Sequence, residues 1–303
     1  MDESVIEREL AIRLAAAAWL DSERAHGREM WTQPQLADFR FQGKRLPLMD
    51  RERGIRKPAG MVAALSIRTV FTATGGRRPY DDVTGSDGLL RYMWRGDDPG
   101  HAENRALREA MVRRLPLIWF SGFAQGLYAA IYPVYLLAEE PGERRFVVAL
   151  GDEQRMATVG TVDDAVRRYV ERTTWQRLHE PAFRAGVMLA YETQCSVCAL
   201  GHAPLLDAAH ITPDADEAGV PVTSNGLALC KIHHAAFDAG ILGIRPDLTV
   251  HIRADVLDEV DGPMLRHGLQ EYHDRRLLVV PRSRRDRPDA ERLTRRYEQF
   301  LVG

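Results

Sequence analysis

All three cysteines of the chain lie in one short window toward its C-terminal end. Cys195 and Cys198 form a Cys-x-x-Cys pair, and Cys230 opens a Cys-x-x-His pair that ends at His233. Two such pairs can converge on one ion, and three cysteines with one histidine make a common structural zinc site. A small unit that cannot bury enough apolar surface gains folding free energy from such an ion. The window therefore predicts a structural Zn²⁺ held by these four residues.

Two other histidines, His202 and His234, are alternative fourth ligands for this ion. We prefer His233 because its spacing from Cys230 mirrors the spacing of the first pair. On a helix, His233 and His234 would point about 100° apart. One of them can then face the zinc ion while the other faces a second site.

The same window has the pattern of two strands followed by a helix. Residues 205–211 read as a strand, and Asn225-Gly226 reads as a turn before a second apolar strand. Residues 232–238 then begin a helix. We expect this ββα order to place side chains from three elements around one site.

Several side chains of the window suit the hydrolysis of a phosphodiester bond, which needs an activated water, a metal ion and a fixed geometry. His210 ends the first strand, and a neutral imidazole is a suitable base near pH 7. Asn225 can hold the loop and orient that base. His234 and Asp238 share one helix face at i, i+4, where a divalent cation could bind opposite Asp207.

This segment resembles the HNH, or ββα-metal, endonucleases, with His210, Asn225 and His234 in the places of the H, N and H. The resemblance implies that His210 is the general base that activates water. It also implies that Asn225 positions the base and the loop, and that His234 ligates a catalytic Mg²⁺ or Mn²⁺.

One position departs from the family's pattern. Many members carry Asp or His directly before the general base as a second metal ligand, and this chain has Ala209 there. Asp207 lies two residues earlier on the same strand face, so we expect it to replace the missing ligand. Asp238 is a weaker candidate, because it could equally cap the helix or form a surface ion pair.

The wider chain resembles bacterial two-domain HNH restriction endonucleases, from residue 179 through the HNH core to the tail at residue 300. In several of these enzymes the N-terminal domain is a PUA-superfamily or SRA-like reader of modified cytosine. The resemblance implies an α+β fold with a curved-sheet reader domain over residues 1–160. A helical linker over residues 161–190 and a zinc-stapled HNH nuclease domain over residues 191–303 would follow. The expected partner is double-stranded DNA that carries a modification.

Reading a modified base requires a pocket that stacks the flipped base and bonds to its edge. Aromatic side chains beside polar ones are therefore of interest in the N-terminal half. The best candidates for contacting DNA or a flipped base are Tyr80, Asp81, Asp82, Trp94 and Arg95. For any one aromatic residue, a place in the core is the more common role.

Strand and helix patterns support the α+β expectation for the N-terminal half. The expected strands are residues 66–72, 89–94, 117–120, 128–137 and 146–150, and the expected helices are residues 4–18 and 104–114. Further along, one helix capped by Asp163 and a second over residues 180–191 should join the domains. A terminal helix is expected over residues 289–300.

Composition sets broader limits. The net charge of −2 gives no overall basic field. The chain has only three lysines, so its positive charge is nearly all arginine, which suits phosphate and base contacts.

Residues 115–138 lack charge, but Gly122, Gly126 and Pro133 interrupt them, so two buried strands fit better than a membrane span. The chain begins with an amphipathic helical pattern rather than a secretory signal. We therefore expect a cytoplasmic protein with reduced thiols and no membrane partner.

Two other functions stay open. The first is an HNH endonuclease that acts on unmodified DNA, and the second is a non-catalytic zinc-bound DNA-binding module. One HNH site cuts one strand at a time, so a double-strand break favours a homodimer. The apolar faces at Val166, Tyr169 and Val170 and at Phe183 and Val187 are candidate dimer contacts, although they could equally pack within the chain.

Overall fold

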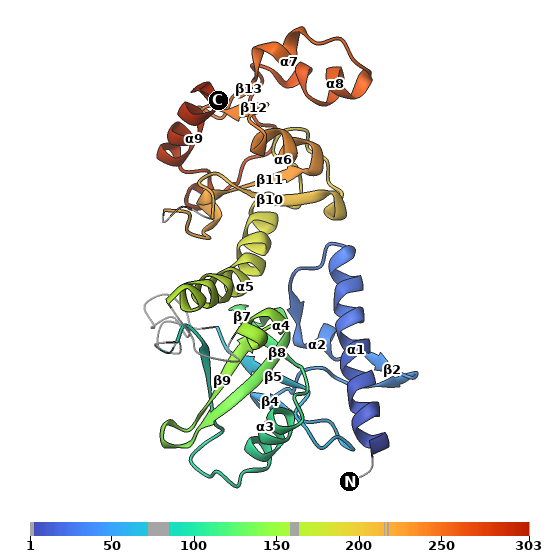
Figure 1. The fold of residues 1–303 in the computed structure, drawn as a ribbon. Helices are drawn as coiled ribbons and strands as arrows, with labels where there is room; N and C mark the ends of the chain where they lie inside the picture. The colour runs from blue at the N-terminus through green and yellow to red at the C-terminus, as the bar shows by residue number, and fades with distance from the viewer. Residues whose placement is uncertain are drawn as a thin grey trace. The chain divides into compact units, whose positions relative to one another are not determined.

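The computed structural model describes residues 3–71, 85, 87–157, 164–214, 216 and 218–302. The chain divides into two compact units, which we call the first unit (Met1–His179) and the second unit (Glu180–Gly303). The mixed α+β class expected from the sequence is confirmed (Figure 1). The PUA-like or SRA-like identity of the N-terminal sheet stays a prediction.

The first unit is built around one mixed sheet. Its helices are α1 (Glu3–Ala25), α2 (Gln33–Leu36), α3 (Ala102–Val112) and α4 (Asp152–Ala157). Its strands are β1 (Trp31–Thr32), β2 (Arg40–Phe41), β3 (Lys44–Arg45), β4 (Ile55–Arg56), β5 (Ser66–Thr69), β6 (Leu90–Met93), β7 (Leu117–Ala124), β8 (Leu127–Glu140) and β9 (Arg145–Leu150).

Among the described residues, seven strands form this sheet in the order β4-β5-β7-β8-β9-β6, with β1 added beside β8. The β5–β7 pair is parallel and the other neighbours are antiparallel. Register shifts interrupt the β7–β8 and β8–β9 ladders. Such irregularities bend a strand and increase its twist, and the sheet is curled into a half-barrel.

The uncharged run that could have been read as a membrane span forms the two central strands, β7 and β8. Alternate β7 side chains enter different cores: Leu117 and Trp119 pack with α3, whereas Ile118 and Phe120 pack with α1. A strand buried on both faces needs apolar side chains on both, which explains the absence of charge. No helix within the described ranges is long and apolar enough to cross a membrane.

Several element boundaries differ from the sequence-based expectation. Strand β5 ends at Thr69 because its parallel pairing with β7 ends there, opposite Ser121. Strand β8 continues through Glu139 and Glu140 because both residues still pair with β9. Arginines neutralise both carboxylates, Arg108 at Glu139 and Arg91 at Glu140.

The two expected joining helices are one continuous helix, α5 (Asp164–Ala190), so the prediction of a break was wrong. Pro181 lies inside α5, where it removes one backbone donor without ending the helix. The expected cap, Asp163, lies outside the described residues. Within the first unit, the buried Gln154 amide donates to the Val170 carbonyl and the Thr174 hydroxyl of α5.

The second unit begins with the end of α5 and has its own apolar core. Its further elements are β10 (Leu206–His210), β11 (Gly226–Cys230), α6 (Lys231–Asp238), β12 (Leu242–Ile244), β13 (Val250–Ile252), α7 (Ala254–Asp258), α8 (Pro263–Gly268) and α9 (Ala290–Val302). Elements β10, β11 and α6 follow the expected ββα order. Phe183 and Val187 of α5 are buried in this core, so they are not exposed dimer contacts.

Candidate active site and metal centre

The three cysteines and His233 converge where β11 joins α6. Cys230 is the N-cap residue of α6, and His233 lies in the first helical turn, three residues later on the same side. Cys195 and Cys198 lie in the turn beyond α5. A backbone hydrogen bond joins that turn to β11: the Ser196 N–H donates to the Ala228 carbonyl (2.7 Å).

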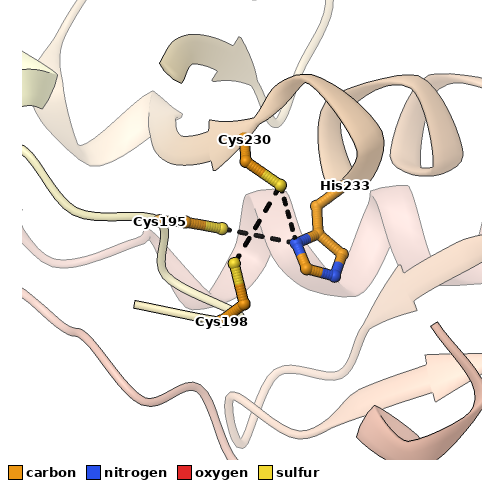
Figure 2. Close-up of side chains that lie close together, drawn as sticks. All are labelled: Cys195, Cys198, Cys230 and His233. Carbon is orange, nitrogen blue, oxygen red and sulfur yellow. Dashed lines mark hydrogen bonds between the residues drawn. The ribbon is translucent and has the colours of Figure 1, made fainter. Parts of the chain in front are cut away.

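The four ligand atoms lie within 4.8 Å of one another (Figure 2). The Cys198 and Cys230 sulfurs are 4.0 Å apart, and His233 Nδ1 lies 3.4 Å from Cys195 Sγ and 3.1 Å from Cys230 Sγ. Zn–S bonds of about 2.3 Å in a tetrahedron would separate two sulfurs by about 3.8 Å. The cluster therefore fits one tetrahedral zinc ion, and neither His202 nor His234 belongs to it.

A second contact fixes the orientation of His233. Its Nε2 lies 2.9 Å from the carbonyl oxygen of Gly268, and Tyr272 packs edge-on against the ring. When Nε2–H donates to that carbonyl, Nδ1 carries the lone pair that a metal needs. Gly268, at the end of α8, thus leaves Nδ1 as the nitrogen that would bind a metal ion.

The electrostatics of the three thiols would favour a cation at this cluster. Hydrogen bonds from Cys195 and Cys198 lower the pKa of Cys230, whereas contacts with Cys195 and Cys230 raise the pKa of Cys198. Three sulfurs this close cannot all be thiolates without a compensating positive charge. A zinc ion would supply that charge.

A second site begins at the opposite end of the hairpin from Cys230, where His210 of β10 pairs with Gly226 of β11. The Phe183 ring stacks on the His210 ring with centroids 3.9 Å apart. A Cβ at Gly226 would come within 2.9 Å of Phe183 and 2.3 Å of Val187. Glycine at position 226 therefore allows α5 to approach closely enough to hold the His210 ring.

Asn225 fastens both ends of the loop that separates the two strands. Its side-chain amide donates to the carbonyls of Thr212 and Val220 (both 3.1 Å), and its oxygen accepts from the Thr212 N–H (2.9 Å). Asn225 is fully buried. These bonds satisfy its amide in the interior and fix the backbone two residues beyond His210.

Burial lowers the pKa of His210, and the charge of His234 acts in the same direction, while Asp214 and Asp238 oppose it. His210 therefore stays neutral at neutral pH, as a base must. Its Nε2 is shielded from solvent and has no hydrogen-bond partner among the described residues. That leaves Nδ1 as the nitrogen that a molecule in the adjoining pocket can reach.

His234 lies between two carboxylates. Its Nδ1 is 3.5 Å from an Asp207 oxygen, and its Nε2 is 3.2 Å from an Asp238 oxygen. Both candidate second ligands are therefore beside the histidine expected to bind the catalytic cation. An imidazole flanked by carboxylates is a donor set that Mn²⁺ or Mg²⁺ accepts.

Asp207 has cationic partners that sequence reasoning missed. Arg184 donates to one of its oxygens (2.8 Å) and Lys231 to the other (2.5 Å). Burial alone would raise the pKa of Asp207, but Lys231 and Arg184 lower it below its ordinary value. The spacing of Lys231 from His234 on α6 could have indicated its place, whereas nothing in the sequence linked Arg184 of α5 to β10.

These side chains line one open pocket of about 340 Å³. Its lining includes Asp207, Ala208, His210, His234 and Asp238 from the ββα elements. It is completed by Glu180, Phe183, Arg184, Pro213, Asp214 and Arg296. Ala209 is fully buried and does not contribute.

Comparison with known proteins agrees with this geometry: residues 195–245 match the profile of the HNH endonuclease family. Residues 195–245 form an HNH endonuclease domain. The chain is therefore a DNA endonuclease. The HNH domain contains the cysteine–histidine cluster, both strands of the hairpin and α6, while Phe183, Arg184 and Arg296 of the pocket lie outside the matched segment.

Two solved structures are similar to the chain beyond the HNH domain. The first is described as a modification-dependent TagI restriction endonuclease, with 19% identity, TM-score 0.32, and coverage of 82% of this chain and 85% of that one. The second is the type IV phosphorothioation-dependent restriction endonuclease ScoMcrA, with 17% identity, TM-score 0.24, and coverage of 62% and 48%. No curated protein sequence matches the chain.

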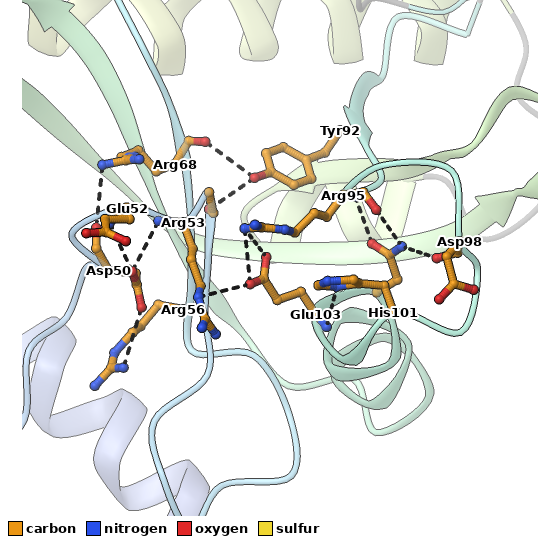
Figure 3. A network of polar contacts seen from close by, with 12 residues as sticks. Asp50, Glu52, Arg53, Arg56, Arg68, Tyr92, Arg95, Asp98, His101 and Glu103 are labelled. Atoms are coloured by element: carbon orange, nitrogen blue, oxygen red, sulfur yellow. Dashed lines mark hydrogen bonds and ion pairs between the residues drawn. The ribbon is translucent and has the colours of Figure 1, made fainter.

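The residues expected to contact a base have separate surroundings in the first unit. Tyr80, Asp81 and Asp82 lie outside the described residues. Arg95 forms an ion pair with Glu103 (3.2 Å), within the polar network that Figure 3 shows. The Trp94 ring lies beneath the Arg108 guanidinium (5.1 Å). These contacts give Arg95 and Trp94 structural partners, and their role in reading a base stays a prediction.

Proposed function

We propose that this endonuclease cuts DNA that carries a modified base, with the first unit reading the modification and the HNH domain cutting the strand. The observation that carries the cutting role is the open pocket that joins His210, His234 and two carboxylates beside a closed cysteine–histidine cluster. The catalytic side chains all belong to the second unit. The first unit is thus available to recognise the modified base, a task that an HNH site alone does not perform.

In this proposal His210 accepts a proton from water at Nδ1 while the water oxygen attacks phosphorus. The P–O bond to the leaving oxygen breaks, and that oxygen takes a proton from solvent. Asn225 holds the loop, and the Phe183 ring holds the imidazole, so the base cannot turn away from the pocket. His234, with Asp207 or Asp238, would hold Mg²⁺ or Mn²⁺. Such a cation stabilises charge on the phosphate and the leaving oxygen. Cys195, Cys198, Cys230 and His233 would hold a structural Zn²⁺.

A digestion series tests the substrate. Plasmids that are otherwise identical would carry plain cytosine, 5-methylcytosine, 5-hydroxymethylcytosine or phosphorothioate linkages, and each would be incubated with the full chain and Mg²⁺ or Mn²⁺. We expect cleavage of one cytosine-modified plasmid and none of the plain one, with His210→Ala as the inactive control. Equal cleavage of all four plasmids would overturn modification dependence and favour an endonuclease for unmodified DNA.

We also propose that the active form is a homodimer, or dimerises on DNA. One HNH pocket hydrolyses one strand at a time, so two copies are the simplest source of a double-strand break. Sedimentation of the chain alone and with a modified duplex would show the dimer. A monomer in both conditions that only nicks its substrate would contradict it.

A further inference from the structure

Arg296 of α9 lies at a junction of two cavities in the second unit. It lines the HNH pocket, and it also lines a neighbouring pocket of about 210 Å³ between α6, β12 and α9. Asp238 is the other residue that both pockets share. A strand that entered the HNH pocket could therefore continue past Arg296. This position lies beyond the segment that matches the HNH family.

Arg296 differs from the other arginines that line the two pockets because it forms no ion pair with a described carboxylate. Among the described residues, three arginines line the two pockets. Arg184 forms an ion pair with Asp207 (2.8 Å), and Arg253 forms one with Asp255 (2.6 Å). Within the described part of the chain, Arg296 has no carboxylate partner. No ion pair with a described carboxylate therefore occupies the Arg296 guanidinium, and its charge is available to an anion at the pocket.

The Arg296 guanidinium is nevertheless held in place. It lies 4.8 Å from the centre of the Phe237 ring, and one of its nitrogens donates to the Phe237 carbonyl at the end of α6 (3.2 Å). A guanidinium has five N–H donors, so most of them are left for another acceptor. A side chain that is already positioned loses less conformational entropy when it binds a ligand.

From these observations we infer that Arg296 binds a backbone phosphate of the DNA strand at the HNH pocket. This inference rests on the proposal that the pocket is the cleavage site. A planar guanidinium matches two phosphate oxygens. Because the pocket otherwise contains several carboxylates, an arginine that forms no ion pair with the described residues also reduces the repulsion that an incoming phosphate meets.

The test compares Arg296→Ala with Arg295→Ala, a matched control on the same helix. Arg295 is exposed and pairs with Glu291 (3.5 Å) outside the pocket. Both changes would be made in full-length chain that also carries His210→Ala, so that DNA is bound but not cut. Binding to a modified duplex would be measured from low to high salt.

We expect Arg296→Ala to reduce the slope of log affinity against log salt by about 0.9, the value for one lost phosphate contact, and Arg295→Ala to leave it unchanged. With His210 restored, cleavage by Arg296→Ala should fall on the order of tenfold to a hundredfold. Arg296→Lys keeps the charge and should keep the slope.

An unchanged salt slope for Arg296→Ala would overturn the inference and leave Arg296 as a cap for α6, even if activity fell. Thermal unfolding and zinc content identify a variant that has lost its fold. Arg296→Gln, which removes the charge but keeps a donor for the Phe237 carbonyl, then takes the place of Arg296→Ala with the same expected loss of slope. Failure of the cleavage-site proposal would look different, because His210→Ala alone would still cut.

Discussion

His233 and His234 are neighbours on α6, yet the structure gives them opposite surroundings. His233 is buried, its Nδ1 lies beside two cysteine sulfurs, and its Nε2 is occupied by a carbonyl. His234 is partly exposed, lies between two carboxylates and lines an open pocket. One helical step thus separates a closed site with four protein ligands from a site with room for water and substrate.

The difference between the two histidines follows from general metal chemistry. Structural zinc sites use all four positions for protein ligands, whereas catalytic metal sites keep positions open. The rotation of about 100° between adjacent helical residues lets α6 serve both. We therefore expect substitutions around His233 to act on folding, and substitutions around His234 to act on catalysis with the fold intact.

The largest effect should come from Cys230→Ser. Zinc binding to such sites contributes on the order of 10 kcal/mol, comparable to the whole stability of a domain. The variant should therefore lose its metal and unfold the second unit. Metal analysis and circular dichroism of the purified chain would measure both effects. A Cys230→Ser chain that stays folded and still cuts DNA would contradict a structural role for the cysteine–histidine cluster.

His210→Ala should lower the cleavage rate by about 10²–10⁴-fold, the usual contribution of a general base. Zinc content and DNA affinity should not change, because His210 lies outside the cysteine cluster. Single-turnover cleavage of a modified duplex is the measurement. More than about a tenth of the wild-type rate would show that another group activates the water.

Asp207→Asn should have a smaller effect, seen mainly in the metal dependence. If Asp207 is the second ligand, the Mg²⁺ or Mn²⁺ concentration for half-maximal activity should rise on the order of tenfold. Asp238→Asn is the matched comparison, because Asp238 flanks the other nitrogen of the same histidine. If the metal dependence of Asp207→Asn were normal and that of Asp238→Asn were shifted, Asp238 rather than Asp207 would be the second ligand of the catalytic cation.

The parts of the site that could be predicted from the sequence are those set by local spacing. The zinc pairs, the ββα order and the loop-holding place of Asn225 all depend on residues close together in the chain or joined by one hairpin. Arg184 and Phe183 were missed as pocket residues, because α5 reaches β10 only through tertiary packing across Gly226. Arg296 reaches α6 from α9 for the same reason.

In the first unit, sequence patterns located strands β5 to β9, but not the short strands β1 to β4 or the contacts of the strand ends. The order of strands in the sheet, with β6 beside β9 and β5 parallel to β7, has no local signature. The expected break between two helices was wrong because Pro181 sits within α5, where packing against the second unit's core outweighs the lost hydrogen bond. The sequence did not reveal the structural partners of Trp94 and Arg95. These partners, Arg108 and Glu103, lie on a separate helix, α3.

The most direct test of the two-site account is a side-by-side measurement of zinc content and cleavage rate for His233→Ala and His234→Ala. His234→Ala should retain one zinc ion per chain and a normal thermal transition, and should lose cleavage. His233→Ala should lose zinc and the cooperative unfolding of the second unit. A His234→Ala chain that cuts at the wild-type rate, or a His233→Ala chain with full zinc content, would contradict the account.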